Sequence, residues 1–110
     1  TILQNVLLIK KRGKRNMNLI DLYNNPPVKL KFGKGYELSI INTGYGAEQG
    51  LYEIGCFQHG KFVELPGITE PGDTVKGWLT KENVDGIILK MSAISGTDPV
   101  NNSAEGENNE

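Results

Sequence analysis

Cys56 and His59 have the most reactive side chains in this sequence and are its only cysteine and only histidine. A thiol beside an imidazole can act as a nucleophile with its general base. The two residues, however, stand three positions apart across the predicted end of a strand and a turn, and Cys56 falls on the apolar side of that strand. We therefore interpret Cys56 as a small buried hydrophobic residue and His59 as a solvated turn residue.

The other residue types that support catalysis or metal binding are too few or too dispersed. One cysteine and one histidine exclude an internal disulfide and a cysteine-rich zinc site, and they favour a reducing, cytoplasmic setting. No two carboxylates stand out as a general acid and base, because they are spread over strands and loops: Glu48, Glu53, Glu64, Glu70 and Asp73. The sequence therefore predicts no enzyme, no cofactor and no metal site.

A glycine-spaced loop, Asn42–Gly50, is the main candidate binding feature. It resembles a phosphate loop only superficially, because it lies between two predicted strands and no helix N-terminus follows it. It is longer than a hairpin needs, and long loops in compact domains are often binding loops. The predicted partner-binding residues are Gly44, Tyr45, Gly46, Glu48 and Gln49 of this loop, together with Trp78.

Lysines near the start of the predicted folded domain support nucleic-acid binding as an alternative. Lys29, Lys31 and Lys34 are its only basic cluster, and Tyr36 follows as a stacking aromatic, a combination that suits single-stranded nucleic acid. A solvated strand face explains the same lysines. Two interpretations also stay open for the larger aromatic set, which can be core or can form a stacking or protein-contact platform: Tyr36, Tyr45, Tyr52 and Trp78.

The elements that must position these residues show the period-two alternation of β-strands. Glycine-bearing turns separate the first four strands, and Gly60 suits a left-handed turn position. Tyr52, Ile54 and Cys56 share the more apolar face of their strand, which we assign to the core. The predicted strands are Val28–Phe32, Tyr36–Ile41, Leu51–Phe57, Lys61–Leu65 and, as a fifth strand or an edge segment, Val75–Leu79.

A C-terminal helix, Lys81–Ser95, is predicted to cover one face of this sheet. Thr80 is a credible N-cap and Gly96 a C-terminal stop. Gly86 within the helix costs about 1 kcal/mol against alanine, and we expect it to let the helix backbone approach the sheet closely. The apolar positions recur at helical spacing: Val84, Ile87, Ile88, Met91 and Ile94. The predicted class is α+β, with an antiparallel sheet of four to five strands covered on one face by this amphipathic helix.

Charge divides the chain into three parts. Residues 1–16 hold five bases and no acid, residues 17–96 hold seven bases and nine acids, and residues 97–110 hold four acids and no base. We therefore predict a disordered basic extension, a single domain over residues 17–96 and a disordered acidic tail over residues 97–110. The mildly acidic body argues against a nucleic-acid groove on it, and the apolar run Ile2–Ile9 is too short to span a bilayer.

Three interpretations of residues 1–16 stay open: a membrane-surface or partner helix, a basic arm that touches nucleic acid, and a stretch outside the native protein. The third rests on back-translation, because AGR codons at Arg12 and Arg15 would make a purine-rich run like a bacterial ribosome-binding site. Met17 would then be the start, and CGN codons at both arginines would remove this hypothesis. Met17–Asn25 is predicted to be a short helical lead-in.

The middle of the chain, about residues 32–84, follows an ordered pattern. It runs from Phe32-Gly33-Lys34-Gly35-Tyr36 through Tyr45-Gly46 and Gln49-Gly50-Leu51-Tyr52-Glu53 to Val75-x-Gly77-Trp78-Leu79-Thr80. This pattern resembles small bacteriophage accessory proteins of unassigned function. The resemblance implies a phage origin and a place in the cytoplasm of an infected host cell, and it brings no known chemistry.

The leading functional prediction is a non-enzymatic phage accessory protein that binds and inhibits a host bacterial protein, such as a defence or transcription component. Two alternatives remain. A nucleic-acid or nucleotide-binding module would show a steep salt dependence of binding. A small structural virion protein would be a homo-oligomer in sedimentation and would be present in purified particles.

Overall fold

Alternation of apolar and polar residues produces the central strands, as the sequence predicted. The computed structural model describes residues 26–101. Its elements, in chain order, are strand β1 (Val28–Lys31), 3₁₀ turn η2 (Gly33–Gly35), strand β2 (Tyr36–Ile41), 3₁₀ turn η3 (Ala47–Gln49), strands β3 (Tyr52–Gln58), β4 (Lys61–Phe62) and β5 (Val75–Leu79), helix α2 (Lys81–Ser95) and strand β6 (Val100–Asn101).

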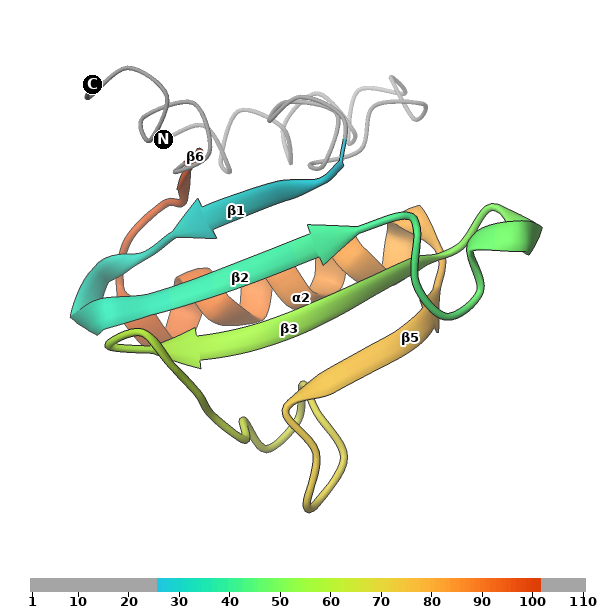
Figure 1. Ribbon diagram of the computed structural model, residues 1–110. Coiled ribbons are helices and arrows are strands. Elements are labelled where there is room, and N and C mark those ends of the chain that lie inside the picture. The colour runs from blue at the N-terminus through green and yellow to red at the C-terminus, as the bar shows by residue number, and fades with distance from the viewer. Residues whose placement is uncertain (1–25, 102–110) are drawn as a thin grey trace.

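All the strands join one antiparallel sheet. Its order is β4–β3–β2–β1–β6, and β5 pairs with β3 outside this path. Figure 1 shows β5 beside β3 and β1 beside β2. β5 and β4 divide the outer edge of β3 between them, β5 beside residues 52–55 and β4 beside residues 57–58. The predicted α+β class is confirmed. The sheet has six strands in place of four or five because β6, a strand of two residues, adds to β1.

The helix covers one face of the sheet, and the core lies between these two layers (Figure 1). Ile54 and Cys56 are both buried there, which confirms the predicted face of β3. Burying one large aliphatic side chain contributes about 1.5–3 kcal/mol, so these two apolar surfaces provide the main driving force for the fold. Among residues 26–101, the largest fully buried side chains are Leu30, Leu38, Ile40, Ile54, Cys56, Val84, Ile88 and Met91.

Thr80 caps the N-terminus of α2 and Gly96 ends the helix, as predicted. The Thr80 hydroxyl accepts from the Asn83 backbone N–H at 3.1 Å, and the Asn83 side chain accepts from the Thr80 N–H at 3.1 Å. Gly96 ends the helix at φ 77°. Ile94 departs from the predicted core face, because it is 41% exposed. It lies about 80° round the helix from Val84, at the margin of the buried arc.

Residues 97–101 pack against the folded domain, beyond the domain boundary predicted at residue 96. Thr97 Oγ1 accepts from the Gly33 N–H at 2.7 Å, and β6 pairs with Leu30 and Lys31 of β1. The prediction of a disordered tail from residue 97 is thus wrong for residues 97–101. The polar, acidic composition of this segment suggested disorder. Strand pairing, however, uses backbone groups, which a polar sequence supplies as well as an apolar one.

The second predicted hairpin forms with a shorter return strand. His59 and Gly60 adopt φ values of 53° and 80°, the left-handed pair that a two-residue hairpin turn requires. The strand predicted for Lys61–Leu65 ends at Phe62. The chain turns after Leu65, whose carbonyl accepts from the N–H groups of Ile68 and Thr69, both at 2.9 Å. Predictions that concern residues 1–25 and 102–110 lie outside the described residues.

Gly86 does not bring the helix against the sheet, so that expectation is wrong. A Cβ built at Gly86 would meet nothing within 4 Å. We therefore expect Gly86→Ala to raise the free energy of unfolding by about 1 kcal/mol through helix propensity alone, measured by urea denaturation. Gly96 is the matched control: its Cβ would also meet nothing, but its φ of 77° disfavours alanine. A loss of stability in Gly86→Ala would contradict this prediction.

Candidate functional site

A β-bulge in β5 sets the direction of Trp78. Tyr52 pairs with Leu79 and Ile54 with Lys76, so Gly77 and Trp78 together face the single residue Glu53. Bulges re-aim side chains in this way. Trp78 has a left-handed φ of 61° and is 58% exposed to solvent. A bulky residue held in this conformation costs of order 1–3 kcal/mol.

The Asn42–Gly50 loop is a folded unit held by its own backbone. The Gly46 carbonyl accepts from the N–H groups of Gln49 and Leu51, each at 3.0 Å, which closes the loop around η3. Glu53 anchors the loop to β3, since its Oε1 accepts from the Tyr45 N–H at 3.2 Å. The loop therefore presents Tyr45 from a defined backbone.

Two glycines let this loop pack on the bulge. A Cβ at Gly77 would lie 2.8 Å from Tyr45 Cβ. Gly46 adopts φ 90°, and a Cβ there would lie 3.2 Å from the Cα of Trp78. The Trp78 N–H donates to the Tyr45 carbonyl at 3.3 Å across this contact. Side chains at either glycine would push the loop away from β5.

The result is an open hollow of about 230 Å³, which we call the Tyr–Trp hollow. Tyr45 is 68% exposed at its wall, and Glu48 and Gln49 supply polar groups. All six predicted partner-binding residues line it, so the structure brings them together. Its lining is Gly44, Tyr45, Gly46, Ala47, Glu48, Gln49 and Trp78.

The residues of the nucleic-acid alternative do not share one surface. Lys34 Nζ donates to the carbonyl of Ile94 at 3.2 Å, close to the helix C-terminus, where a cation is favourable. Lys29 lies over the Phe57 ring on the open face, 5.4 Å from its centroid. Tyr36 packs partly buried against the core, as Tyr52 does. Lys31 stands opposite Glu37 in the strand register.

Cys56 is buried in the core, while His59 is exposed at the hairpin tip. Burial raises the pKa of the Cys56 thiol from 9.0 to about 11. Because the thiolate is the nucleophile, we expect iodoacetamide at pH 8 to modify native Cys56 at least about 100-fold more slowly than the urea-unfolded chain. Mass spectrometry measures both rates. Similar rates would show that the thiol is accessible.

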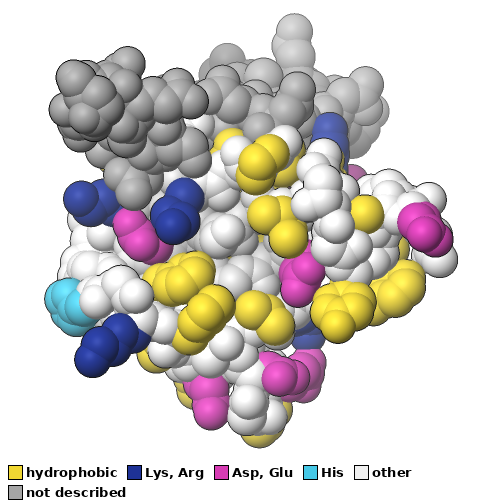
Figure 2. Space-filling model, in the orientation of Figure 1, with side chains coloured by type: hydrophobic (Ala, Val, Ile, Leu, Met, Phe, Trp, Pro, Cys, Tyr) yellow, Lys and Arg dark blue, Asp and Glu magenta, His cyan; other side chains and the backbone are white. Residues whose placement is uncertain are grey.

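Two surface features were missed by the sequence analysis. One is a groove of about 440 Å³ between β5 and α2, to which Trp78 also contributes. The other is a group of hydrophobic side chains on the sheet face opposite α2, visible in yellow in Figure 2. Phe57 and Phe62 stack there with ring centroids 4.4 Å apart. The period-two alternation could have indicated the second feature, since Phe57 falls on the non-core face of β3.

Within residues 26–101, no three His, Cys, Asp or Glu side chains are grouped so that they could hold a metal ion. No helix in the same range has the length and apolarity to cross a membrane. Comparison with protein-family models, curated proteins and solved structures finds no match. Function therefore has to be inferred from the geometry of the surface itself.

Proposed function

We propose that this chain is a non-enzymatic protein-binding domain that docks a partner through the Tyr–Trp hollow. The observation that carries the proposal is Trp78, a large aromatic residue held exposed on a left-handed backbone. Strain of this kind persists where the surrounding structure enforces it, and it clusters at functional sites. Glycine at position 78 would adopt this conformation without strain. The presence of tryptophan there therefore points to a role for the indole side chain.

The composition of the hollow suits a protein partner. Trp and Tyr dominate interface hot spots because they bury a large area with few rotatable bonds. Glu48 and Gln49 beside them can satisfy polar groups at the rim of an interface. The loop is held by backbone hydrogen bonds, so little ordering entropy is lost on binding.

The resemblance to phage accessory proteins supports a host bacterial protein as this partner, with inhibition as the consequence of occupying its surface. A defence or transcription component is the class that the resemblance favours. The lysines of the nucleic-acid alternative are divided between the open face and the helix C-terminus, so the geometry supports protein binding better than nucleic-acid binding.

Affinity capture from a bacterial lysate tests the proposal. The wild-type chain is expected to retain one partner in a one-to-one complex, and Tyr45→Ala is expected to lose it. Phe62→Ala is the control, since Phe62 is a similarly exposed aromatic residue that does not line the hollow. Equal capture by the wild type and Tyr45→Ala would remove the hollow as the binding site.

A further inference from the structure

The groove between β5 and α2 runs along the edge of the sheet. Four consecutive residues of β5, from Lys76 to Leu79, line it. The β-bulge at Gly77 and Trp78 breaks the alternation of side-chain directions, so all four positions can border one groove. The opposite wall is a stripe of α2 that includes Glu82, Gly86 and Lys90.

The outer edge of β5 has no strand beside it among residues 26–101. Ile54 pairs with Lys76, and the Thr74 carbonyl accepts from the Cys56 N–H at 2.9 Å, so the backbone groups of residues 74 and 76 point towards β3. Alternate residues point the other way in an antiparallel ladder. Val75 and Gly77 therefore direct their N–H and C=O groups outward, where a backbone partner can bind them.

The two walls of the groove match in length. α2 rises about 12 Å from Glu82 to Lys90, at 1.5 Å per residue. Four residues of extended chain span about 13 Å. The helix wall leaves room for a backbone, since Gly86 lines the groove and a Cβ built there would meet nothing within 4 Å. A strand of about four residues would fill this space.

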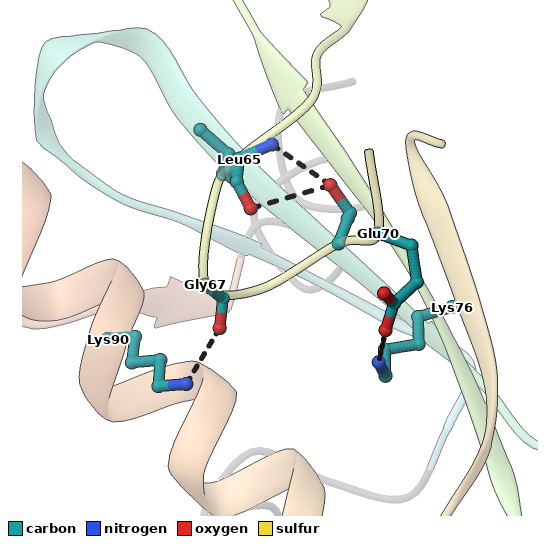
Figure 3. Close-up of polar contacts among 6 residues, drawn as sticks. Leu65, Gly67, Glu70, Lys76 and Lys90 are labelled. Carbon is teal, nitrogen blue, oxygen red and sulfur yellow. Dashed lines mark hydrogen bonds and ion pairs between the residues drawn. The ribbon is translucent and has the colours of Figure 1, made fainter. Parts of the chain in front are cut away.

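Charge distinguishes one end of the groove from the other. Lys90 from α2 and Lys76 from β5 reach into the same space, as Figure 3 shows. Lys90 Nζ donates to the Gly67 carbonyl at 2.7 Å, which leaves two of its three N–H groups for a ligand. Lys76 pairs with exposed Glu70 at 2.6 Å, and surface pairs of this kind exchange partners at little cost. Glu82 lies at the opposite end.

We propose that an extended peptide segment of the partner adds as a strand to the outer edge of β5 and lies in this groove. Its backbone binds Val75 and Gly77, and an acidic side chain at one end binds Lys76 and Lys90. Strand addition of this type draws its affinity from main-chain hydrogen bonds and its specificity from alternate side chains. The inference rests on the proposed protein-binding function and extends it, because Trp78 lines both the groove and the Tyr–Trp hollow.

A yeast-displayed library of random eight-residue peptides, selected against the full chain, provides the test. Gly86→Leu is the blocking variant: nothing lies within 4 Å of the added Cβ and leucine favours helix, so the fold is retained while the groove is filled. We expect selected peptides to alternate β-branched or aromatic residues with others, to carry Asp or Glu, and to bind Gly86→Leu at least about tenfold more weakly than the wild type.

Amide hydrogen exchange measured by NMR on the selected complexes locates the peptide. Gains in protection at Val75 and Gly77 support strand addition. Absence of any enriched peptide, equal binding to Gly86→Leu, or changes confined to residues 44–50 would each overturn it. Failure of the two proposals can be told apart. Partner capture lost in Tyr45→Ala but kept in Gly86→Leu refutes the groove alone, whereas peptides bound in the groove without any captured partner refute the proposed function alone.

Discussion

Replacing Trp78 by alanine is expected to weaken binding of the captured partner by at least about 30-fold, the effect of losing a hot spot of about 2 kcal/mol. Within the described part of the chain, Trp78 is the one residue that lines both the Tyr–Trp hollow and the β5–α2 groove. Its truncation therefore removes apolar contact area from both surfaces at once. Titration calorimetry with the purified partner measures the change.

Two variants separate lost contact from lost folding. Phe62→Ala removes an aromatic residue of almost equal exposure, 59% against 58%, and is expected to bind within about twofold of the wild type. Trp78→Gly removes the indole and also relieves the left-handed backbone at φ 61°. It should therefore stay folded by circular dichroism and still lose binding. Wild-type affinity in Trp78→Gly would show that the indole is not an anchor.

Ile88→Ala is expected to destabilise the fold by about 2–5 kcal/mol. Ile88 is fully buried between α2 and the sheet, so the substitution removes transfer free energy and leaves a cavity that rigid strands cannot fill. That cost is a large part of the total stability of a small domain. Urea denaturation followed by far-ultraviolet circular dichroism measures it.

Ile94→Ala is the matched control, because it makes the same chemical change in the same helix. Ile94 is 41% exposed, and its truncation is expected to cost less than about 1 kcal/mol. Equal losses for the two variants would mean that the core does not lie between α2 and the sheet.

Strands and helix were predictable because their signals are local. The alternation in Val28–Lys31 and Tyr36–Ile41 reports which face of a strand is buried, and the spacing from Val84 to Met91 does so for the helix. Thr80 and Gly96 mark the helix ends through hydrogen bonding and backbone preference within a few residues. β6 was missed because two polar residues carry no such periodicity, and its pairing depends on β1 being nearby.

The predicted partner-binding residues illustrate an intermediate case. A long glycine-spaced loop between strands indicates a binding loop, and its length and composition are visible in the sequence. Its contact with Trp78, about thirty positions later, depends on the bulge in β5 and on Gly46 and Gly77, where a side chain would collide with the opposite segment. The basic residues of the nucleic-acid alternative are not brought together in the same way, because Lys34 belongs to a turn that reaches the helix end while Lys29 stays on the open face.

The amino-acid sequence by itself determined an α+β domain, the order of its first five strands along the chain, the limits of its helix and the loop that bears Tyr45. Only the tertiary structure decided that Trp78 is strained and exposed, that no strand within residues 26–101 pairs with the outer edge of β5, and that this edge faces Gly86 and Lys90 across a groove. The physical reason is the sequence separation over which each kind of interaction acts. Periodicity, caps and turns act over a few residues, whereas a surface is assembled from segments whose separation in the chain says nothing about their distance in space.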